Sequence, residues 1–597
     1  MKNSTLTRLD DNARRPGDDW FFPPGSFSAL RSSRMAAMLH RVFLVVLVLC
    51  VRGPVLDDPF ILDDFTLLYK LADNQGCVAA AFELYSFARP GETSDWLQWW
   101  ASSDLKLAYF RPFSSVLLWL ERTLWRSHTW LYHVDSLLLY VGCVLLLHAL
   151  LRRMWGAWTG CFGAALFAVA PAHLTAVQWV ANRVDIVSAW WLLLALLLYQ
   201  RGLRSGAPAW RSVGPVTAAF LLGVLAKESA VLLPVALPVF HFLFMSAGGN
   251  GHRVGPARYR FLAVHLACQL SVAGLWSVYY MWRDYGVRSG YFILTLSDFP
   301  AALGSMFKAA LLYSANLLFF VKISETHKHT MWTDYLTQSI LLVTGGVVLI
   351  CLLVYFLRRR FMLYAFLYGV FLVPALPFQV SDRLGFFDVA VIAMAMSEVL
   401  AILPLRIPSR GMAVALGVVM AGSLVVTPAA LSWLRAVDRD QWCQDYQVRI
   451  VADVRSALTG HPEVDTVYFL NLASPIQVVS LTHHLRLSLG RPRLNVGILT
   501  AFEYPPQIML LGGSRFRLRS ATGKAFFQTF PERLFLTESW FAKETAFRAH
   551  GFSAEVVKVA AGNILEMEYS FERLFRDPRS LFLVWGDSVT GFVPYSL

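Results

Sequence analysis

Two pairs of aspartates, Asp57/Asp58 and Asp63/Asp64, follow the first long apolar run of the chain, in the stretch VLDDPFILDDFTL. Carboxylates are costly inside hydrocarbon, so we expect this stretch just outside the bilayer, on a non-cytoplasmic loop. A pair of acids at a membrane surface suits general-base work on a hydroxyl group, or metal binding. The alternative is a solvated turn in which the acids only end the apolar run.

Further ionisable motifs lie beside other apolar runs. In chain order these residues are Arg111, His173, Asn182, Arg183, Asp185, Lys227, Glu228, Asp382 and Arg383. Carboxylates could supply acid–base chemistry, and Arg or Lys could bind an anionic group. Each motif alone also fits a helix cap, an ion pair at a hairpin or a snorkelling side chain. They predict a site if the chain topology places them on one membrane face.

The composition indicates a polytopic membrane protein. Of 597 residues, 56% are hydrophobic and 16% are charged, whereas a soluble protein carries roughly 25% charged residues. Many apolar runs have the length that crosses a bilayer. We expect eleven spans, at about 36–56, 131–151, 158–175, 185–200, 213–227, 229–246, 260–281, 338–357, 361–380, 386–404 and 410–433.

Arginine clusters orient these spans, because positive charge is retained on the cytoplasmic side. Clusters precede the first span and follow the second, fourth, sixth, eighth and tenth, so the polar tail 1–34 is expected inside. These clusters explain much of the net charge of +13, so the charge does not indicate a nucleic-acid partner. All the motifs above then fall on the outer face of the membrane. The two long outer loops are expected at about 57–130 and 282–337.

Two other apolar stretches and the C-terminal region complete the prediction. Residues 112–125 are short and charged, which favours an interfacial helix, and 301–321 is expected to be interfacial or re-entrant. Residues 434–597 alternate apolar and polar residues between Gly/Pro turns, which predicts an outer soluble domain that is α/β or β-rich. Two weaker alternatives are a Cys77–Cys443 disulfide and metal binding by the His327-Lys-His329 cluster.

The order of the motifs resembles the GT-C fold membrane glycosyltransferases. The segments are ILDDF, YFRPFSSVLLWLERTLW, WLYHVDSLLLY, HLTAVQWVANRVDIVSAWWLLLALLLY, LAKESAVLLP and LPFQVSDRLGFF. They are most similar to the transmembrane-and-TPR O-mannosyltransferases and their bacterial relatives, over about residues 45–400. The chain departs from that pattern at APAH (170–173) and SDRL (381–384), and 434–597 has no 34-residue helical repeat.

The resemblance implies inverting transfer of a sugar from a polyprenyl-phosphate donor to a protein hydroxyl or a glycan at the outer membrane face. Asp63 would be the general base, and Asp64 would orient the site or bind a metal. The implied phosphate-binding residues are Arg111, Arg183, Lys227 and Arg383, with support from His173, Asp185 and Glu228. No obligatory cofactor is expected, and a divalent metal ion is left open.

Two other functions remain as alternatives. A transporter or lipid flippase would place charges in mid-span and often has paired halves, and a non-catalytic scaffold would bind a partner through 434–597. The Arg-rich, Ala/Leu-rich composition suggests a bacterial inner membrane, with the C-terminal region in the periplasm.

Overall fold

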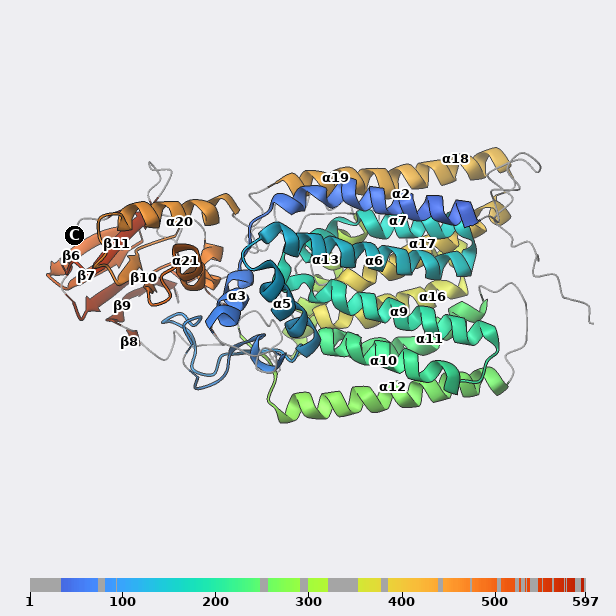
Figure 1. The fold of residues 1–597 in the computed structure, drawn as a ribbon, viewed down its shortest axis with the longest axis horizontal. Coiled ribbons are helices and arrows are strands. Elements are labelled where there is room, and N and C mark those ends of the chain that lie inside the picture. The colour runs from blue at the N-terminus through green and yellow to red at the C-terminus, as the bar shows by residue number, and fades with distance from the viewer. Residues whose placement is uncertain are drawn as a thin grey trace, which may run out of the picture.

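A computed structural model shows a helical bundle joined end to end with a β-rich C-terminal region (Figure 1). The structure describes residues 34–594 except 74–80, 93, 247–255, 290–298, 320–352, 377–384, 408, 439–443, 473–474, 502–505, 521–525, 528–531, 533, 537–545, 550, 561–562, 574, 576 and 586–591. Helices α3 (Asp63–Asp73) and α5 (Pro112–Trp125) lie between the two parts.

The first half of the bundle is built from seven helices, of which the first two are separated by the long loop that carries α3 and α5. They are α2 (Arg34–Arg52), α6 (Thr129–Trp155), α7 (Ala157–Val169), α9 (Val184–Ser205), α10 (Trp210–Ala226), α11 (Leu233–Ser246) and α12 (Pro256–Trp282). Short helices η2 (Pro171–His173), α8 (Leu174–Gln178) and η3 (Val180–Arg183) connect α7 to α9, and η4 (Glu228–Leu232) connects α10 to α11.

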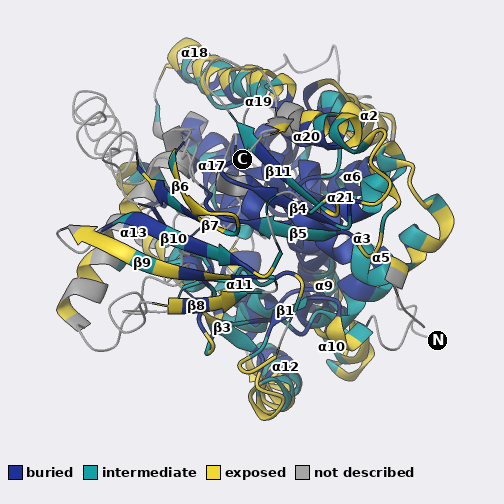
Figure 2. Ribbon diagram, turned by 90° about the vertical axis from the view of Figure 1, so that its left-hand side faces the viewer, coloured by how far each residue is buried: buried dark blue, intermediate teal, exposed yellow. Residues whose placement is uncertain are grey.

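The second half of the bundle adds α13 (Phe299–Phe319), α16 (Arg359–Leu372), η6 (Val373–Ala375), α17 (Phe386–Arg406), α18 (Arg410–Ala421) and α19 (Thr427–Val437). The last helix returns to the first: α19 packs along α2, and the Ser432 hydroxyl donates to the Val169 carbonyl of α7 at 2.6 Å. Large apolar side chains on the outside of the bundle, such as Leu275 and Trp282 of α12, are about three-quarters exposed (74% and 76%), as expected of a surface in contact with lipid (Figure 2).

Seven described helices are long and apolar enough to cross a membrane, and the bent pair α7–α8 would make eight. All eight coincide with predicted spans, which supports an integral membrane protein. Helices α10 and α16–η6 are shorter apolar helices at two further predicted positions. The predicted span 338–357 lies almost wholly outside the described residues, so the total of eleven stays a prediction.

Helix α13 covers the stretch that was expected to be interfacial or re-entrant. It is one helix of 21 residues. Tyr313 is buried against Leu372 and Ala375, and the Ser314 and Tyr368 hydroxyls lie 3.0 Å apart, so α13 packs on α16 as part of the bundle. Its position relative to the bilayer surface stays a prediction.

The predicted outer loops pair with each other. Strands β1 (Ser86–Ala88) and β2 (Lys106–Ala108) come from the first loop and β3 (Gly286–Arg288) from the later one. They form an antiparallel sheet in the order β1-β2-β3, with Lys106 opposite Arg288. The predicted helix 112–125 forms with those bounds, as α5. This small sheet fixes the two loops at one end of the bundle.

The C-terminal region contains two sheets, as the alternating pattern predicts. A mixed sheet has the order β12-β11-β4-β5, and an antiparallel sheet has the order β6-β7-β10-β9-β8. The strands are β4 (Thr466–Phe469), β5 (Asn495–Ile498), β6 (Gln507–Gly512), β7 (Arg515–Arg519), β8 (Ala546–Ala549), β9 (Phe552–Ala560), β10 (Asn563–Phe571), β11 (Ser580–Trp585) and β12 (Phe592–Pro594). Helices α20 (Gln444–Leu458) and α21 (Leu481–Leu489) accompany the mixed sheet.

Helix α3 is held against the C-terminal region through α21. The Phe65 ring stacks on His484 with centroids 3.8 Å apart, and the Thr66 hydroxyl lies 3.1 Å from Nδ1 of His483. The Trp99 indole donates to the last carbonyl of β5 at 2.8 Å. One apolar cluster therefore runs from the first outer loop into the C-terminal region, and it sets the position of α3.

The buried histidines predict a pH dependence. Burial lowers the pKa of His483 to about 4 and that of His484 to about 3, from an ordinary 6.5. At these two groups the unfolded state binds protons first as the pH falls, so the stability that the two neutral histidines contribute is constant above about pH 6.5 and is lost between 6.5 and 4. Each tenfold weakening of proton binding in the folded state corresponds to about 1.4 kcal/mol. This contribution should appear as a pH-dependent difference in thermal unfolding, from pH 7.5 to 5 in detergent, between the full chain and a variant that lacks one of the histidines.

The variant His484→Phe keeps the ring stacked on Phe65 and should flatten the decline. The matched control is His461→Phe, whose imidazole is 60% exposed and which should leave the slope unchanged. An equally steep decline in His484→Phe would contradict the assignment.

Candidate functional site

A cavity of about 610 Å³ opens where the outer loops meet the bundle, a volume in the range of small-molecule sites. Its charged lining residues are Asp63, Arg111, Asp185, Lys227, Glu228 and Asp388. Its aromatic lining residues are Tyr85, Phe87, Tyr109, Trp179, Trp276, Tyr280, Phe371, Phe386 and Phe387. Five of the nine predicted site residues therefore meet at one cavity, although they are spread over 166 positions from Asp63 to Glu228.

Arg111 forms a bidentate ion pair with Glu228. Its Nε and one terminal nitrogen donate to the Glu228 carboxylate at 2.9 and 2.6 Å. The guanidinium also lies 4.3 Å from the centre of the Tyr109 ring. Burial alone would lower the pKa of Arg111, but the Glu228 carboxylate outweighs it and the pKa is raised. Arg111 is therefore a permanent cation. Glu228 uses only part of the five N–H donors of Arg111, so the others are available to another acceptor.

Lys227 is placed by a break between two helices. Helix α10 ends at Ala226, and Lys227 adopts an extended conformation (φ −155°, ψ 137°) before η4 begins at Glu228. The Lys227 ammonium donates to Oδ1 of Asp185, in the first turn of α9. The AKES motif thus supplies both members of a charged hairpin, and each residue pairs with a partner far away in the sequence.

The aspartates of ILDDF have different surroundings. Asp63 begins α3 and lines the cavity. Asp64 is only 1% exposed and accepts the backbone N–H groups of Ile61 at 3.0 Å and Ala181 at 2.6 Å. Burial raises the pKa of Asp64 to about 7, although these N–H groups favour the carboxylate. Leu62, just before the pair, has a positive φ of 46°, an uncommon conformation for a leucine that the surrounding contacts must hold.

The earlier pair does not line the cavity. Asp57 is exposed, whereas Asp58 is buried and accepts a hydrogen bond from the Gln178 amide at 2.7 Å. His133 lies 3.1 Å from the Asp58 carbonyl. These contacts tie the end of the first span to α6 and α8, so Asp58 has a structural position.

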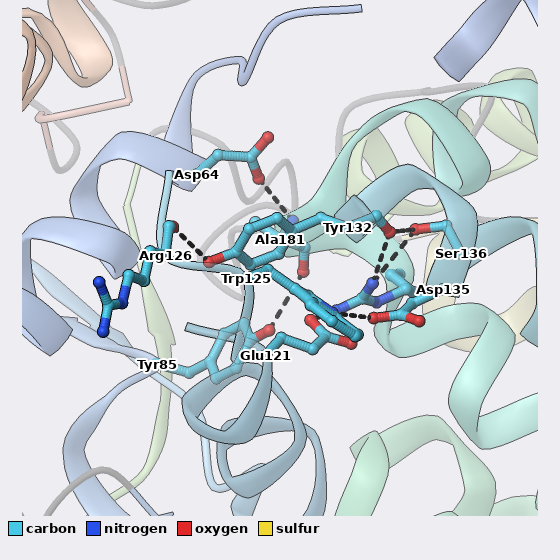
Figure 3. A network of polar contacts seen from close by, with 10 residues as sticks. Asp64, Tyr85, Glu121, Trp125, Arg126, Tyr132, Asp135, Ser136 and Ala181 are labelled. Atoms are coloured by element: carbon cyan, nitrogen blue, oxygen red, sulfur yellow. Dashed lines mark hydrogen bonds and ion pairs between the residues drawn. The ribbon is translucent and has the colours of Figure 1, made fainter. Parts of the chain in front are cut away.

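Arg183 is buried and lies outside the cavity lining. Figure 3 shows the network to which its partners Glu121, Tyr132 and Ser136 belong. Arg183 forms an ion pair with Glu121 of α5 and donates to the Tyr132 carbonyl at 3.0 Å and the Ser136 hydroxyl at 3.3 Å. Burial raises the pKa of Glu121 to about 7, with a further increase from nearby Asp135 and a decrease from Arg183. Arg183 joins α5, α6 and η3 behind the site.

His173 is also away from the cavity, in the core of the bundle. Its Nδ1 lies 2.9 Å from the Tyr140 hydroxyl and its Nε2 3.1 Å from the Phe386 carbonyl. The imidazole stacks on the Phe386 ring with centroids 4.1 Å apart. His173 thereby fixes the start of α17. Arg383, Cys77, Cys443 and the cluster 327–329 lie outside the described residues.

Asp388 is the cavity-lining charge that sequence reasoning missed. It lies in the first turn of α17 and is 1% exposed. An acid near the start of a predicted span is itself a signal of function. The polar motif considered in the sequence ended at Arg383, five residues before Asp388, so this signal was not used. No described group of three or more His, Cys, Asp or Glu residues could hold a metal ion.

Comparisons with known proteins give one match in sequence. No protein-family model matches the chain. A segment of 149 residues is 31% identical to the protein O-mannosyl-transferase Tmtc2 of Drosophila melanogaster. The chain resembles membrane glycosyltransferases. The match covers 24% of this chain and spans only 16% of the length of that relative, and it agrees with the resemblance indicated by the motifs.

Similar solved structures include an oligosaccharyltransferase. The oligosaccharyltransferase of Archaeoglobus fulgidus, determined with a tethered acceptor peptide, is 12% identical over 78% of this chain and 64% of its own, with a TM-score of 0.45. ArnT from Cupriavidus metallidurans, in the apo state, is 14% identical over 78% of this chain and 90% of its own, with a TM-score of 0.42.

The Arg183–Glu121 pair predicts a strong stability effect. Arg183→Met leaves the Glu121 carboxylate buried without its cation, and breaking a buried pair in this way costs about 3–5 kcal/mol. Thermal unfolding of the detergent-purified chain should therefore move to clearly lower temperature. The double variant Arg183→Met/Glu121→Leu removes both charges and should recover much of the loss. A double variant no more stable than Arg183→Met would contradict this reasoning.

Proposed function

We propose that the protein is a glycosyltransferase that moves a sugar from a polyprenyl-phosphate donor to a hydroxyl acceptor, with inversion at the anomeric carbon. The observation that supports this most is the cavity in which Asp63 shares the wall with the ion-paired cations Arg111 and Lys227. A base, fixed cations and an opening at the end of a membrane bundle are what such a transfer requires.

In the proposed reaction, Asp63 accepts the proton of the acceptor hydroxyl as its oxygen attacks the anomeric carbon. The bond between that carbon and the phosphate oxygen breaks, and the polyprenyl phosphate leaves with the bonding electrons. N–H donors of Arg111 and Lys227 that their carboxylate partners do not use stabilise the growing negative charge on the phosphate. Arg383 remains a predicted third phosphate ligand.

The other predicted residues are assigned positioning roles. Glu228 and Asp185 hold Arg111 and Lys227 in place. Asp64 fixes the start of α3 through two backbone N–H groups. Arg183 and His173 act further away, by holding the segments around the cavity.

The proposed acceptor is a protein hydroxyl or a glycan on the extracytoplasmic face. The cavity is lined by Asp63 of α3 and by residues of the predicted outer loops. Figure 1 shows α3 at the end of the bundle that adjoins the C-terminal region. An acceptor would thus approach from the C-terminal side, while the lipid chain of the donor stays in the bilayer. We keep the bacterial inner membrane, with a cytoplasmic N-terminus, as the proposed location.

Asp63→Asn should lower the rate of transfer by about 10²–10⁴-fold, the usual contribution of a general base. The measurement is consumption of polyprenyl-phosphate sugars by membranes that contain the protein. The matched control is Asp57→Asn, since Asp57 is an exposed acid six positions earlier that does not line the cavity. Full activity of a folded Asp63→Asn variant would remove Asp63 as the base.

Lys227→Met should weaken binding of polyprenyl phosphate about tenfold or more, because a charge-assisted hydrogen bond to the phosphate is lost. Binding of polyprenyl phosphate to the purified protein can be followed by native mass spectrometry. Lys106→Met is the control, because Lys106 pairs with Asp284 outside the cavity lining. Equal affinity in both variants would argue against a phosphate contact by Lys227.

A further inference from the structure

Several buried polar atoms of the cavity lining have no hydrogen-bond partner among the described residues. They are two acceptors, Oδ2 of Asp185 and Oδ1 of Asp388, and two donors, Nδ2 of Asn182 and Nε1 of Trp276. Burying a polar atom without a partner costs free energy, and native proteins rarely tolerate it without a reason. Four such atoms on the wall of one cavity are accounted for by a ligand that satisfies them.

The identity of the atoms limits the ligand. A phosphate group has only acceptor oxygens, so it cannot donate a hydrogen bond to the free Oδ2 of the Asp185 carboxylate. A hydroxyl group both donates and accepts, so a ring with several hydroxyls can satisfy all four atoms. Trp276 and Tyr280 add aromatic surface to the same lining, which suits the C–H faces of a sugar ring.

The charge balance limits the ligand further. Both cations of the described lining are already paired, Arg111 with Glu228 and Lys227 with Asp185. The described lining thus holds four acidic side chains, Asp63, Asp185, Glu228 and Asp388, and two cationic ones. A sugar that carried its own carboxylate would be repelled, because like charges at close range in a dry site are strongly unfavourable.

The placement of Asp388 is set by residues that do no chemistry. His173 bonds to the Phe386 carbonyl and stacks on its ring, two positions before Asp388. Phe386 and Phe387 both line the cavity beside the acid. A buried carboxylate on a rigid helix start, among aromatic rings, has the geometry of a specificity residue.

We propose that Asp388, with Asp185, Asn182 and Trp276, forms the subsite for the sugar ring of the donor and selects a hydroxyl-rich sugar that bears no acidic group. This inference rests on the proposed function, and adds the class of sugar and the residue that recognises it. Asp388 contacts hydroxyls of the sugar and takes no part in proton transfer to the acceptor.

The test compares lipids that differ only in the sugar. Purified full-length protein is given polyprenyl phosphate alone, its glucosyl and mannosyl derivatives, and its glucuronosyl derivative, all of one chain length. Wild type should bind at least one of the two neutral derivatives more tightly than the bare phosphate, and should gain nothing from glucuronosyl. In Asp388→Asn the affinity ratio of that neutral derivative to bare phosphate should fall about ten- to a hundredfold, because a buried hydroxyl of the sugar loses its hydrogen-bond partner.

Two further variants keep the test decisive. Asn182→Ala removes an unpartnered donor of the same subsite, and should also lower the ratio if Asp388→Asn does not fold. Glu398→Gln is the matched control, since Glu398 is a buried acid of the same helix that is paired with Arg360 and Tyr364 and does not line the cavity. It should change stability and leave the ratio unchanged.

The outcomes separate this inference from the proposed function. A wild-type protein that binds no glycosyl lipid would overturn both. Binding by wild type with an unchanged ratio in folded Asp388→Asn, or glucuronosyl binding as tight as the neutral derivatives, would overturn the sugar subsite alone. Bare phosphate should bind equally well to Asp388→Asn and wild type, since Asp388 does not face the phosphate.

Discussion

The pairing of charge at the edge of an apolar bundle is the constraint on which the site depends. Arg111 and Lys227 stand where water is scarce, and an isolated charge there would be very costly. Each is therefore matched to a carboxylate, Glu228 or Asp185, carried on a different helix. These pairs fix the relative positions of α5, α9, α10 and η4 around the cavity. The same contacts that permit the cations to be buried also build the walls.

The position of Asp63 depends on parts of the chain that are far apart. Asp64 fastens the start of α3 to Ala181 beside the bundle, while Phe65 and Thr66 fasten it to α21 of the C-terminal region. The uncommon backbone of Leu62 is held between these contacts. The C-terminal region thus helps to hold α3, the helix that carries the proposed base, in its position.

Much of the bundle could be predicted because apolar length and arginine placement are local signals. The cavity residues Asp63, Arg111 and Lys227 could be named because each interrupts or borders an apolar run. Arg183 carries the same signal, but its side chain pairs with Glu121 outside the cavity. The direction of a side chain depends on the packing between helices, which the spacing of residues does not give. Pairing of β2 with β3 likewise depends on loops almost two hundred residues apart, which no local pattern encodes.

The pairing of the two cations with carboxylates also affects the expected rate of the proposed reaction. In the proposed reaction, the phosphate ester must share Arg111 and Lys227 with carboxylates already bound to them, so the ground state is held less tightly than by free cations. As the bond to the sugar breaks, charge on the leaving phosphate grows and draws more strongly on the remaining N–H donors. Stabilisation that increases along the reaction raises the rate, whereas equal stabilisation of substrate and transition state does not. For the proposed transfer, the carboxylates that hold the cations would thus favour both catalysis and release of the lipid phosphate.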